Sequence, residues 1–176
     1  MMGGPGVGKG TFSHMLMDTH PYKYIEAGAI LRAMPTDSKI GKLISAGNLV
    51  PDELVCDLMA KKITDTDIIL DGFPRTLGQA KWLVQNYADK FDIHVLYLAT
   101  DEKTLIARIH KRVREGTKRA DDATIEIIRH RLDNFQKITL PAVEWLRTAP
   151  GIKFSEINAA GAASDNFAEI TTALSK

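Results

Sequence analysis

GGPGVGKGT, at residues 3–11, is the stretch that decides the fold. It matches the pattern G-x-x-x-x-G-K through Gly3, Gly8 and Lys9, and an amphipathic pattern typical of a helix follows it. Glycines lack a Cβ, so successive backbone N–H groups can turn inward. The helix N-terminus adds partial positive charge, and the Lys9 ammonium reaches phosphate oxygens. The stretch therefore predicts a phosphate-binding loop that leads into a helix.

Outward from this loop, strand and helix patterns alternate along the chain. Short apolar runs rich in β-branched residues predict strands at residues 24–25, 67–70, 93–98 and 153–157. Apolar residues at three- and four-residue spacing predict helices at residues 10–19, 54–63, 77–87, 102–115, 123–146 and 165–174. This alternation predicts one α/β domain over residues 1–176, in which helices flank a parallel sheet and ligands bind at the carboxyl ends of its strands.

Three irregularities interrupt this pattern. Residues 27–50 contain no strand pattern and predict a helical insert over one edge of the sheet. Residues 112–122 (RVREGTKRADD) are charged and almost free of apolar side chains, so we expect a surface loop. Only Met1 and Met2 precede Gly3, so we expect the buried strand that should lead into the phosphate loop to be missing. Residues lost before Met1 are the hypothesis that explains its absence.

Composition narrows the class of partner. Lys and Arg number 23 against 22 Asp and Glu, which leaves a net charge near +1 and gives no general attraction to nucleic acid or membranes. An anion site must then come from locally clustered arginines. The single cysteine, Cys56, can form neither an internal disulfide nor a four-ligand zinc site, which fits a reducing compartment. Since no run of 18 apolar residues occurs, we expect a cytoplasmic protein.

The phosphate loop departs from the general pattern in an informative way. Gly10 follows Lys9 where the general pattern has Ser or Thr to hold Mg²⁺, and Thr11 comes one residue later. In this respect the loop resembles that of adenylate kinases and the related UMP-CMP kinases. DGFPRT, at residues 71–76, resembles the most distinctive motif of the same family. The resemblance covers essentially the whole chain. It implies a P-loop NTPase-type fold in which residues 27–50 bind the nucleoside monophosphate (NMP) and residues 112–122 form a short lid.

The resemblance also implies where ATP binds. The lid has no cysteines and hence no zinc, and Mg²⁺ arrives with ATP, held mainly by the nucleotide and by waters that Asp71 orients. The residues implied on the ATP side are Gly4, Gly6, Val7, Gly8, Lys9, Gly10, Thr11, Arg108, Arg112 and Gly161, the last in a turn beside the adenine.

On the acceptor side, arginines are the implied phosphate ligands. Arg75 and Arg32 would clamp the phosphate of AMP, and Arg119 and Arg131 would bridge both phosphate groups. The other residues implied around AMP are Ala27, Asn48, Leu49, Val50, Gly72, Phe73 and Gln79. The catalytic group would comprise Lys9, Asp71, Arg75, Arg108, Arg112, Arg119 and Arg131.

Two residues favour different acceptors. Ala27 stands where adenylate kinases have threonine, which favours a pyrimidine acceptor, as in UMP-CMP kinases. Gln79 stands where adenylate kinases have the glutamine that reads adenine. We favour AMP because an unmatched hydrogen-bonding edge discriminates more strongly than one lost phosphate contact. A UMP-CMP kinase and a nucleotide-binding protein without turnover remain open as alternatives. We expect a monomer whose partners are ATP and AMP.

Overall fold

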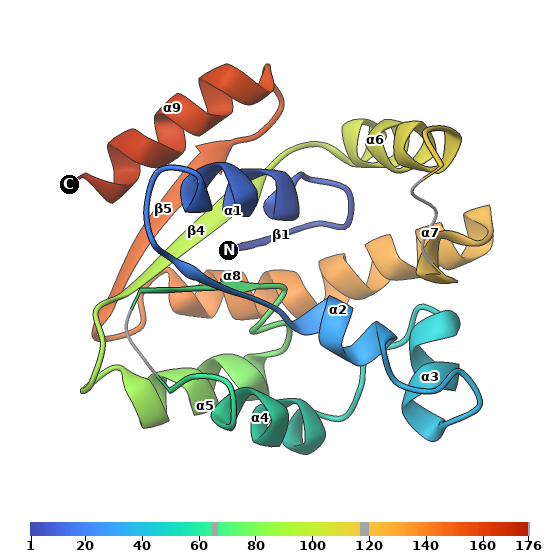
Figure 1. Ribbon diagram of the computed structural model, residues 1–176, viewed down its shortest axis with the longest axis horizontal. Helices are drawn as coiled ribbons and strands as arrows, with labels where there is room; N and C mark the ends of the chain where they lie inside the picture. The colour runs from blue at the N-terminus through green and yellow to red at the C-terminus, as the bar shows by residue number, and fades with distance from the viewer. Residues whose placement is uncertain (65–66, 117–119, 176) are drawn as a thin grey trace.

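The computed structural model describes residues 1–64, 67–116 and 120–175. Within those ranges, strands form two parallel sheets, one in the order β1-β4-β5 and the other pairing β2 with β3 (Figure 1). Their bounds are Met2–Gly3 for β1, Lys23–Glu26 for β2, Ile68–Asp71 for β3, Ile93–Ala99 for β4 and Ile152–Asn158 for β5. All four strands predicted from apolar runs are present, and helices flank the sheets, which confirms the predicted α/β class.

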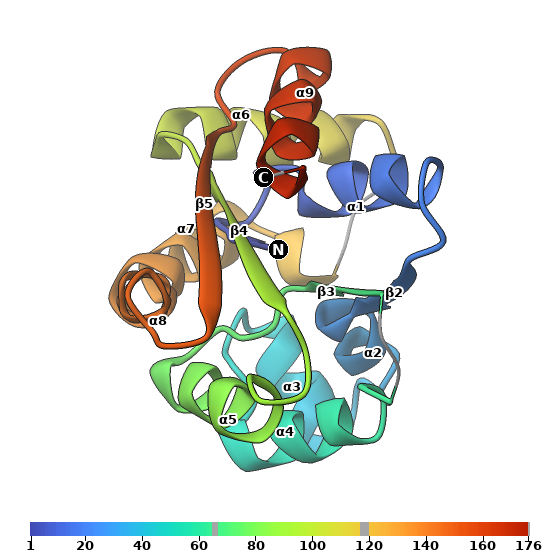
Figure 2. The same ribbon diagram turned by 90° about the vertical axis from the view of Figure 1, so that its left-hand side faces the viewer.

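Helices cover both sides of β4 and β5. Figure 2 shows α1 and α9 on one side of these strands and α8 on the other. The helices are α1 (Lys9–Met17), α2 (Ala27–Arg32), α3 (Lys39–Ser45), α4 (Asp52–Ala60), α5 (Leu77–Tyr87), α6 (Glu102–Arg114), α7 (Ile125–Asn134), α8 (Leu140–Leu146) and α9 (Ala163–Leu174). In the described part of the chain, no helix is long and apolar enough to cross a membrane.

The single helix expected at residues 123–146 is divided. A π-helical turn, η2 (Phe135–Thr139), separates α7 from α8. Pro141 lies in the first turn of α8, where it has no N–H to donate to the preceding turn. A π turn is one way for a helix to accommodate such an interruption. Residues 125–146 are therefore helical throughout, as predicted, but they do not form one regular α-helix.

The strand before the phosphate loop is present, contrary to the expectation that it is missing, although it is only two residues long. Met2 pairs with Tyr97 and Gly3 with Leu98 of β4, and the Met2 side chain is buried. The Met1 ammonium donates to the Leu70 carbonyl oxygen of β3 at 2.6 Å. Beyond β1, a largely apolar cavity of about 510 Å³ lies between β3 and β4. Because this space separates them, β3 and β4 are not hydrogen-bonded to each other and belong to separate sheets.

The position of Met1 leads to a prediction about pH. Desolvation lowers the pKa of the Met1 ammonium from 8.0 to about 6, partly offset by the Asp71 charge. Between these pH values the unfolded 176-residue chain binds more protons than the folded one. Its free energy of unfolding should therefore fall by about 2 kcal/mol as the pH drops from 8 to 6.

Urea unfolding of the free and the N-terminally acetylated chain at several pH values would measure this effect. Burial lowers the pKa of His94 as well, which adds a loss of the same sign below pH 6.5. Acetylation leaves the desolvation of His94 and the charge of Lys153 in place and removes only the smallest cause, the charge of the Met1 ammonium, so the difference between the two chains reports mainly on the Met1 amine. Identical pH profiles for the two chains would show that the amine remains solvated.

Two apolar clusters position the helices that carry the site. Phe12 and Leu16 of α1 pack with Leu105 and Ile109 of α6, and this cluster holds the phosphate loop between the two helices. A second cluster packs Leu31 of α2 and members of α4 and α5 beneath the insert. Residues 27–50 are helical in α2 and α3 and contain no strand, as predicted.

Candidate active site

The phosphate loop has the backbone geometry that its glycines predict. Gly6 and Gly8 have φ values of +85° and +107°, and Gly8 is the N-cap of α1. A Cβ on Gly6 would lie 2.8 Å from Ile109 Cγ1 and 2.9 Å from the Leu105 oxygen, so α6 packs closely against the loop here. Glycine at position 6 is therefore required both by its φ value and by this contact.

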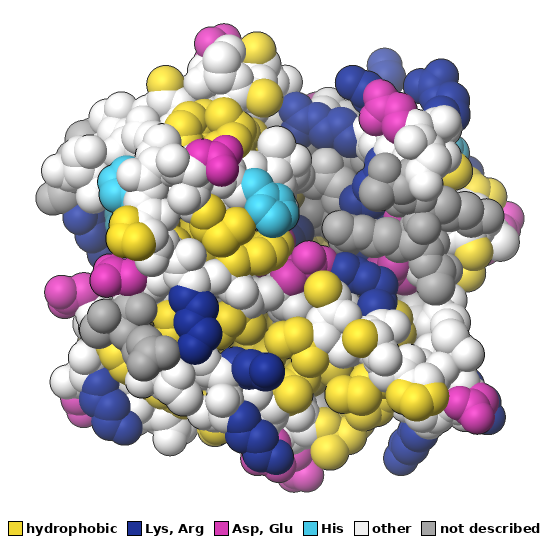
Figure 3. Space-filling view, in the orientation of Figure 1, with side chains coloured by type: hydrophobic (Ala, Val, Ile, Leu, Met, Phe, Trp, Pro, Cys, Tyr) yellow, Lys and Arg dark blue, Asp and Glu magenta, His cyan; other side chains and the backbone are white. Residues whose placement is uncertain are grey.

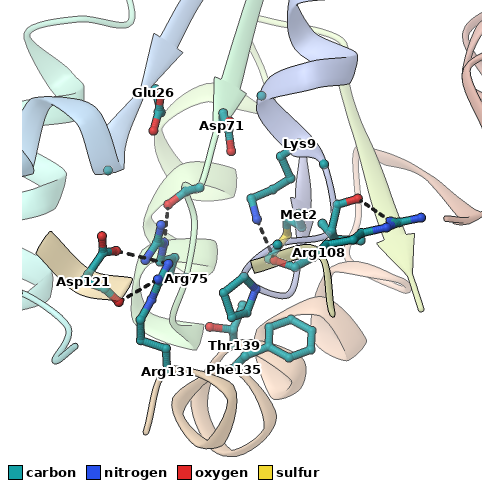
Figure 4. A pocket seen from close by; sticks show the side chains of 18 of the residues that line it. Met2, Lys9, Glu26, Asp71, Arg75, Arg108, Asp121, Arg131, Phe135 and Thr139 are labelled. Carbon is teal, nitrogen blue, oxygen red and sulfur yellow. Dashed lines mark hydrogen bonds and ion pairs between the residues drawn. The ribbon is translucent and has the colours of Figure 1, made fainter. Parts of the chain in front are cut away.

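Two basic side chains contact the loop directly. Lys9 Nζ donates to the carbonyl oxygens of Gly3 and Gly4 at 2.9 and 3.2 Å. Arg108 Nη1, from α6, donates to the Val7 oxygen at 3.1 Å. Figure 4 shows Lys9 between Arg108 on one side and Arg75 with Arg131 on the other. Both cations are thus placed where a polyphosphate on the loop would lie.

On the opposite side, Arg75, which follows β3, converges with Arg32 of α2. The chain turns at Gly72, with φ +72°, and Arg75 Nε donates to the Gly72 oxygen at 2.9 Å. A Cβ on Gly28 would lie 2.8 Å from Arg32 Nη1 and 3.4 Å from Arg75 Nη2, so both guanidinium groups lie over this glycine. Burial of Arg75 lowers its pKa from the usual value, because it removes water from the charged group. The positive charge of Arg131 nearby is the next largest cause of this lowering. An added anion would relieve both effects.

Arg131 and Arg112 are connected by a buried carboxylate. Asp122, in the 3₁₀ turn η1 (Ala120–Asp122), accepts hydrogen bonds from Arg112 Nη2 and Arg131 Nη1, and its side chain is 0% exposed. Arg131 Nη1 also donates to the Asp121 main-chain oxygen at 2.9 Å, and Arg131 Nη2 lies 3.1 Å from Asp121 Oδ2. The two guanidinium groups are therefore held in place before any nucleotide binds.

Carboxylates also contact the acceptor-side cations. Glu26 accepts a hydrogen bond from Arg32 Nη2, and Asp121 Oδ2 lies 4.0 Å from Arg32 Nη1. The other oxygen of Asp121 is buried and finds no hydrogen-bond partner in the described ranges. On the face seen in Figure 3, basic and acidic side chains lie next to each other in the region between α6 and α2. Phosphate oxygens would compete with these carboxylates for the same donors.

Asp71 is the buried carboxylate nearest the start of α1. It ends β3, is 5% exposed, and accepts a hydrogen bond from Tyr24 Oη at 2.7 Å. A Cβ on Gly10 would lie 3.8 Å from Asp71 Oδ2. Over the residues that could be searched, no group of three His, Cys, Asp or Glu side chains could hold a metal ion directly. A single carboxylate beside the loop suits contact with a hydrated cation carried by a nucleotide.

One cleft of about 540 Å³ brings most of the sequence-predicted residues together. Those that line it are Gly6, Val7, Gly8, Lys9, Gly10, Thr11, Arg32, Asn48, Leu49, Asp71, Gly72, Arg75, Arg108, Arg112 and Arg131. Those that do not line it are Gly4, Ala27, Val50, Phe73, Gln79 and Gly161. Arg119 lies outside the described residues.

Sequence reasoning missed the acidic and aromatic part of the cleft wall. Glu26, Asp121, Asn134, Phe135 and Thr139 line it, yet none was a candidate. Asp121 and Asp122 stand at the end of the predicted lid, but nothing in the sequence indicated that they bind arginine side chains. Ala163 and Asn166, in the first turn of α9 just after Gly161, line the cleft, and Asn166 Nδ2 donates to the Gly161 oxygen at 3.2 Å.

Comparison with known proteins agrees with this geometry. The family model described as "Adenylate kinase" matches residues 1–150. The chain belongs to the adenylate kinase family. It is 34% identical over 187 aligned positions to an adenylate kinase of Bacteroides thetaiotaomicron, covering 100% of this chain and 97% of that protein. It is 40% identical over 157 positions to an adenylate kinase of Porphyromonas gingivalis, covering 82% and 79% of the two chains. Membership in the adenylate kinase family confirms the family that the loop and DGFPRT indicated.

Proposed function

We propose that the chain transfers the γ-phosphoryl group of ATP reversibly to AMP and so produces two molecules of ADP. The observation that supports this most is the shared cleft, in which Lys9 and Arg108 lie across from Arg75 and Arg131 (Figure 4). Arg32 lines the same cleft beside Arg75. A transfer between two anions needs cations on both sides, because charge spreads over the transferring oxygens. The adenylate kinase family supplies the identity of the two nucleotides.

In this proposal ATP lies on the loop and AMP lies under the insert. The β- and γ-phosphates replace the Gly3 and Gly4 oxygens as partners of Lys9. The AMP phosphate replaces Glu26 at Arg32 and binds Arg75 beside it. Asn48 and Leu49 line the cleft near the expected base, whereas Ala27, Val50 and Phe73 support the wall from behind.

We propose that Mg²⁺ is part of the MgATP substrate and has no direct ligand from the protein. It would arrive with ATP, and Asp71 would accept hydrogen bonds from water molecules bound to the ion. The position of Asp71 beside Gly10 supports this role. The metal neutralises charge on the polyphosphate, while the residues of the chain orient both nucleotides.

The transfer itself needs no general base. An oxygen of the AMP phosphate attacks the γ-phosphorus, the bond from that phosphorus to the β,γ-bridging oxygen breaks, and the departing ADP keeps the electron pair. Positioning and neutralisation of charge then supply the rate. Closure of residues 27–50 and of the lid predicted at residues 112–122, of which 117–119 lie outside the described residues, would exclude water, a motion for which adenylate kinases are a standard example. We also propose that the chain acts as a monomer in the cytoplasm; its single cysteine supports the reducing compartment.

A coupled assay that follows ADP production from MgATP and AMP tests the proposal. We expect turnover that requires both nucleotides and is faster with AMP than with CMP or UMP. Faster turnover with CMP or UMP would assign a pyrimidine acceptor instead. Nucleotide binding without ADP production would identify a protein that binds nucleotides without catalysis.

A further inference from the structure

Asp52 makes a set of contacts that none of the roles above uses. It is the first residue of α4, and its carboxylate points to the start of α5. Asp52 Oδ2 accepts a hydrogen bond from Thr76 Oγ1 at 2.7 Å, and Oδ1 accepts one from Gln79 Nε2 at 2.8 Å. A Cβ on Gly78 would lie 2.5 Å from Asp52 Oδ2, so only the missing side chain at position 78 permits this approach.

The other end of the Gln79 amide is also occupied. Gln79 Oε1 accepts a hydrogen bond from the Arg75 backbone N–H at 2.8 Å. A carboxylate can only accept and a backbone N–H can only donate. A flipped amide would place its oxygen against Asp52 and its NH₂ group against the Arg75 N–H, which would lose both bonds. Asp52 and Arg75 together therefore allow a single orientation of the amide.

A fixed amide distinguishes bases by the order of their donors and acceptors. With two bonds made, Gln79 retains one N–H and one lone pair on Oε1. Adenine and cytosine carry an amino donor next to a ring-nitrogen acceptor, whereas guanine and uracil carry a carbonyl acceptor next to a ring N–H. The two kinds of base require opposite amide orientations. Since Gln79 is 2% exposed, a mismatched base would leave desolvated polar groups unpaired.

We propose that Asp52 determines the base specificity of the acceptor site by fixing the orientation of Gln79. It acts as a positioning residue, since it touches Gln79 and Thr76 and does not line the cleft. The inference rests on the proposed function, in which AMP is the acceptor, and on the adenine-reading role that the resemblance to adenylate kinases implies for Gln79, which is buried and does not line the cleft in this structure. Asp52 would thereby favour monophosphates whose base carries an amino group over those whose base carries a carbonyl.

The test is Asp52→Asn, compared with Glu53→Gln as the matched control. Glu53 is the next residue of α4, is exposed, and its replacement removes the same charge from the same helix turn. kcat and KM are measured for AMP, CMP, UMP and GMP at saturating ATP, together with KM for ATP. An asparagine at position 52 can donate or accept, so only the Arg75 N–H then favours the present orientation of the Gln79 amide.

We expect Asp52→Asn to lower the ratio of kcat/KM for AMP to that for UMP or GMP at least about tenfold. The change should come mainly from KM for AMP, with KM for ATP unchanged, and Glu53→Gln should keep the original ratio. Gly78→Ala is the second variant. It keeps the Asp52 charge and displaces the carboxylate, so it should shift the ratio in the same direction even if Asp52→Asn does not fold.

An equal loss with all four acceptors, or an unchanged ratio in folded Asp52→Asn and Gly78→Ala, would overturn the inference and leave Asp52 a structural role only. Failure of the proposed function is distinguishable from this, because the unaltered chain would then not phosphorylate AMP at all.

Discussion

Arg75→Ala is expected to lower kcat for AMP phosphorylation at least about 100-fold, the scale of losing one positioned charge donor. Arg75 lines the cleft, its Nε is held by the Gly72 oxygen, and its guanidinium lies over Gly28 beside Arg32. The side chain is therefore oriented before AMP arrives, and its loss removes both a charge and a bidentate phosphate ligand. Steady-state kinetics with AMP varied at saturating ATP measure the effect.

Two further variants make this result specific. Arg75→Lys keeps the charge but cannot form two parallel bonds to a phosphate, so it should recover only part of the lost rate. Arg129→Ala, on the exposed face of α7, serves as the control and should leave kcat and KM within about twofold. Unchanged kinetics in Arg75→Ala would remove this residue from the site.

Asp122→Ala is expected to lower the free energy of unfolding by about 3–5 kcal/mol. The carboxylate is fully buried and accepts from Arg112 on one side and Arg131 on the other. Removing it leaves two guanidinium groups partly buried, with Asp121 as the remaining carboxylate at Arg131. Urea unfolding at neutral pH measures the loss, and kcat should fall as well because both arginines lose their orientation.

Asp133→Ala provides the comparison for Asp122. Asp133 pairs with Lys137 one helical turn away, but the two side chains are 64% and 75% exposed. Such a surface pair contributes at most about 0.5 kcal/mol. If Asp122→Ala destabilised the chain no more than Asp133→Ala, the bridge between Arg112 and Arg131 would not be a structural element of the site.

The parts of the site that a local pattern encodes were predictable from the sequence. The loop before α1 depends on glycines that are adjacent in the chain, and Arg75 belongs to a motif that directly follows a strand. The strands and most helices also depend on local periodicity. Their predicted bounds differ from the observed ones by one or two residues at most ends, apart from the π turn that interrupts residues 123–146.

The hydrogen-bond partners of Asp52 and Asp71 were not predictable because they are distant in sequence. Asp52 meets Gln79 27 residues later, and Tyr24 meets Asp71 across 47 residues. No spacing rule links such pairs, and an isolated Asp or Glu is usually a solvated surface residue. The contacts of Gln79 were likewise only partly predictable from the sequence. Its position in the motif predicted contact with the base, while its present partners, Asp52 and Arg75, could be found only from the folded chain.

The central claim is that one cleft holds the donor and the acceptor nucleotide at the same time. Titration calorimetry with two adenosines joined by a chain of phosphates tests it most directly. We predict that one molecule binds per chain, at least about 100-fold more tightly than ATP, and that Arg75→Ala removes most of this advantage. Binding of two molecules per chain, or binding no tighter than that of ATP, would contradict the account.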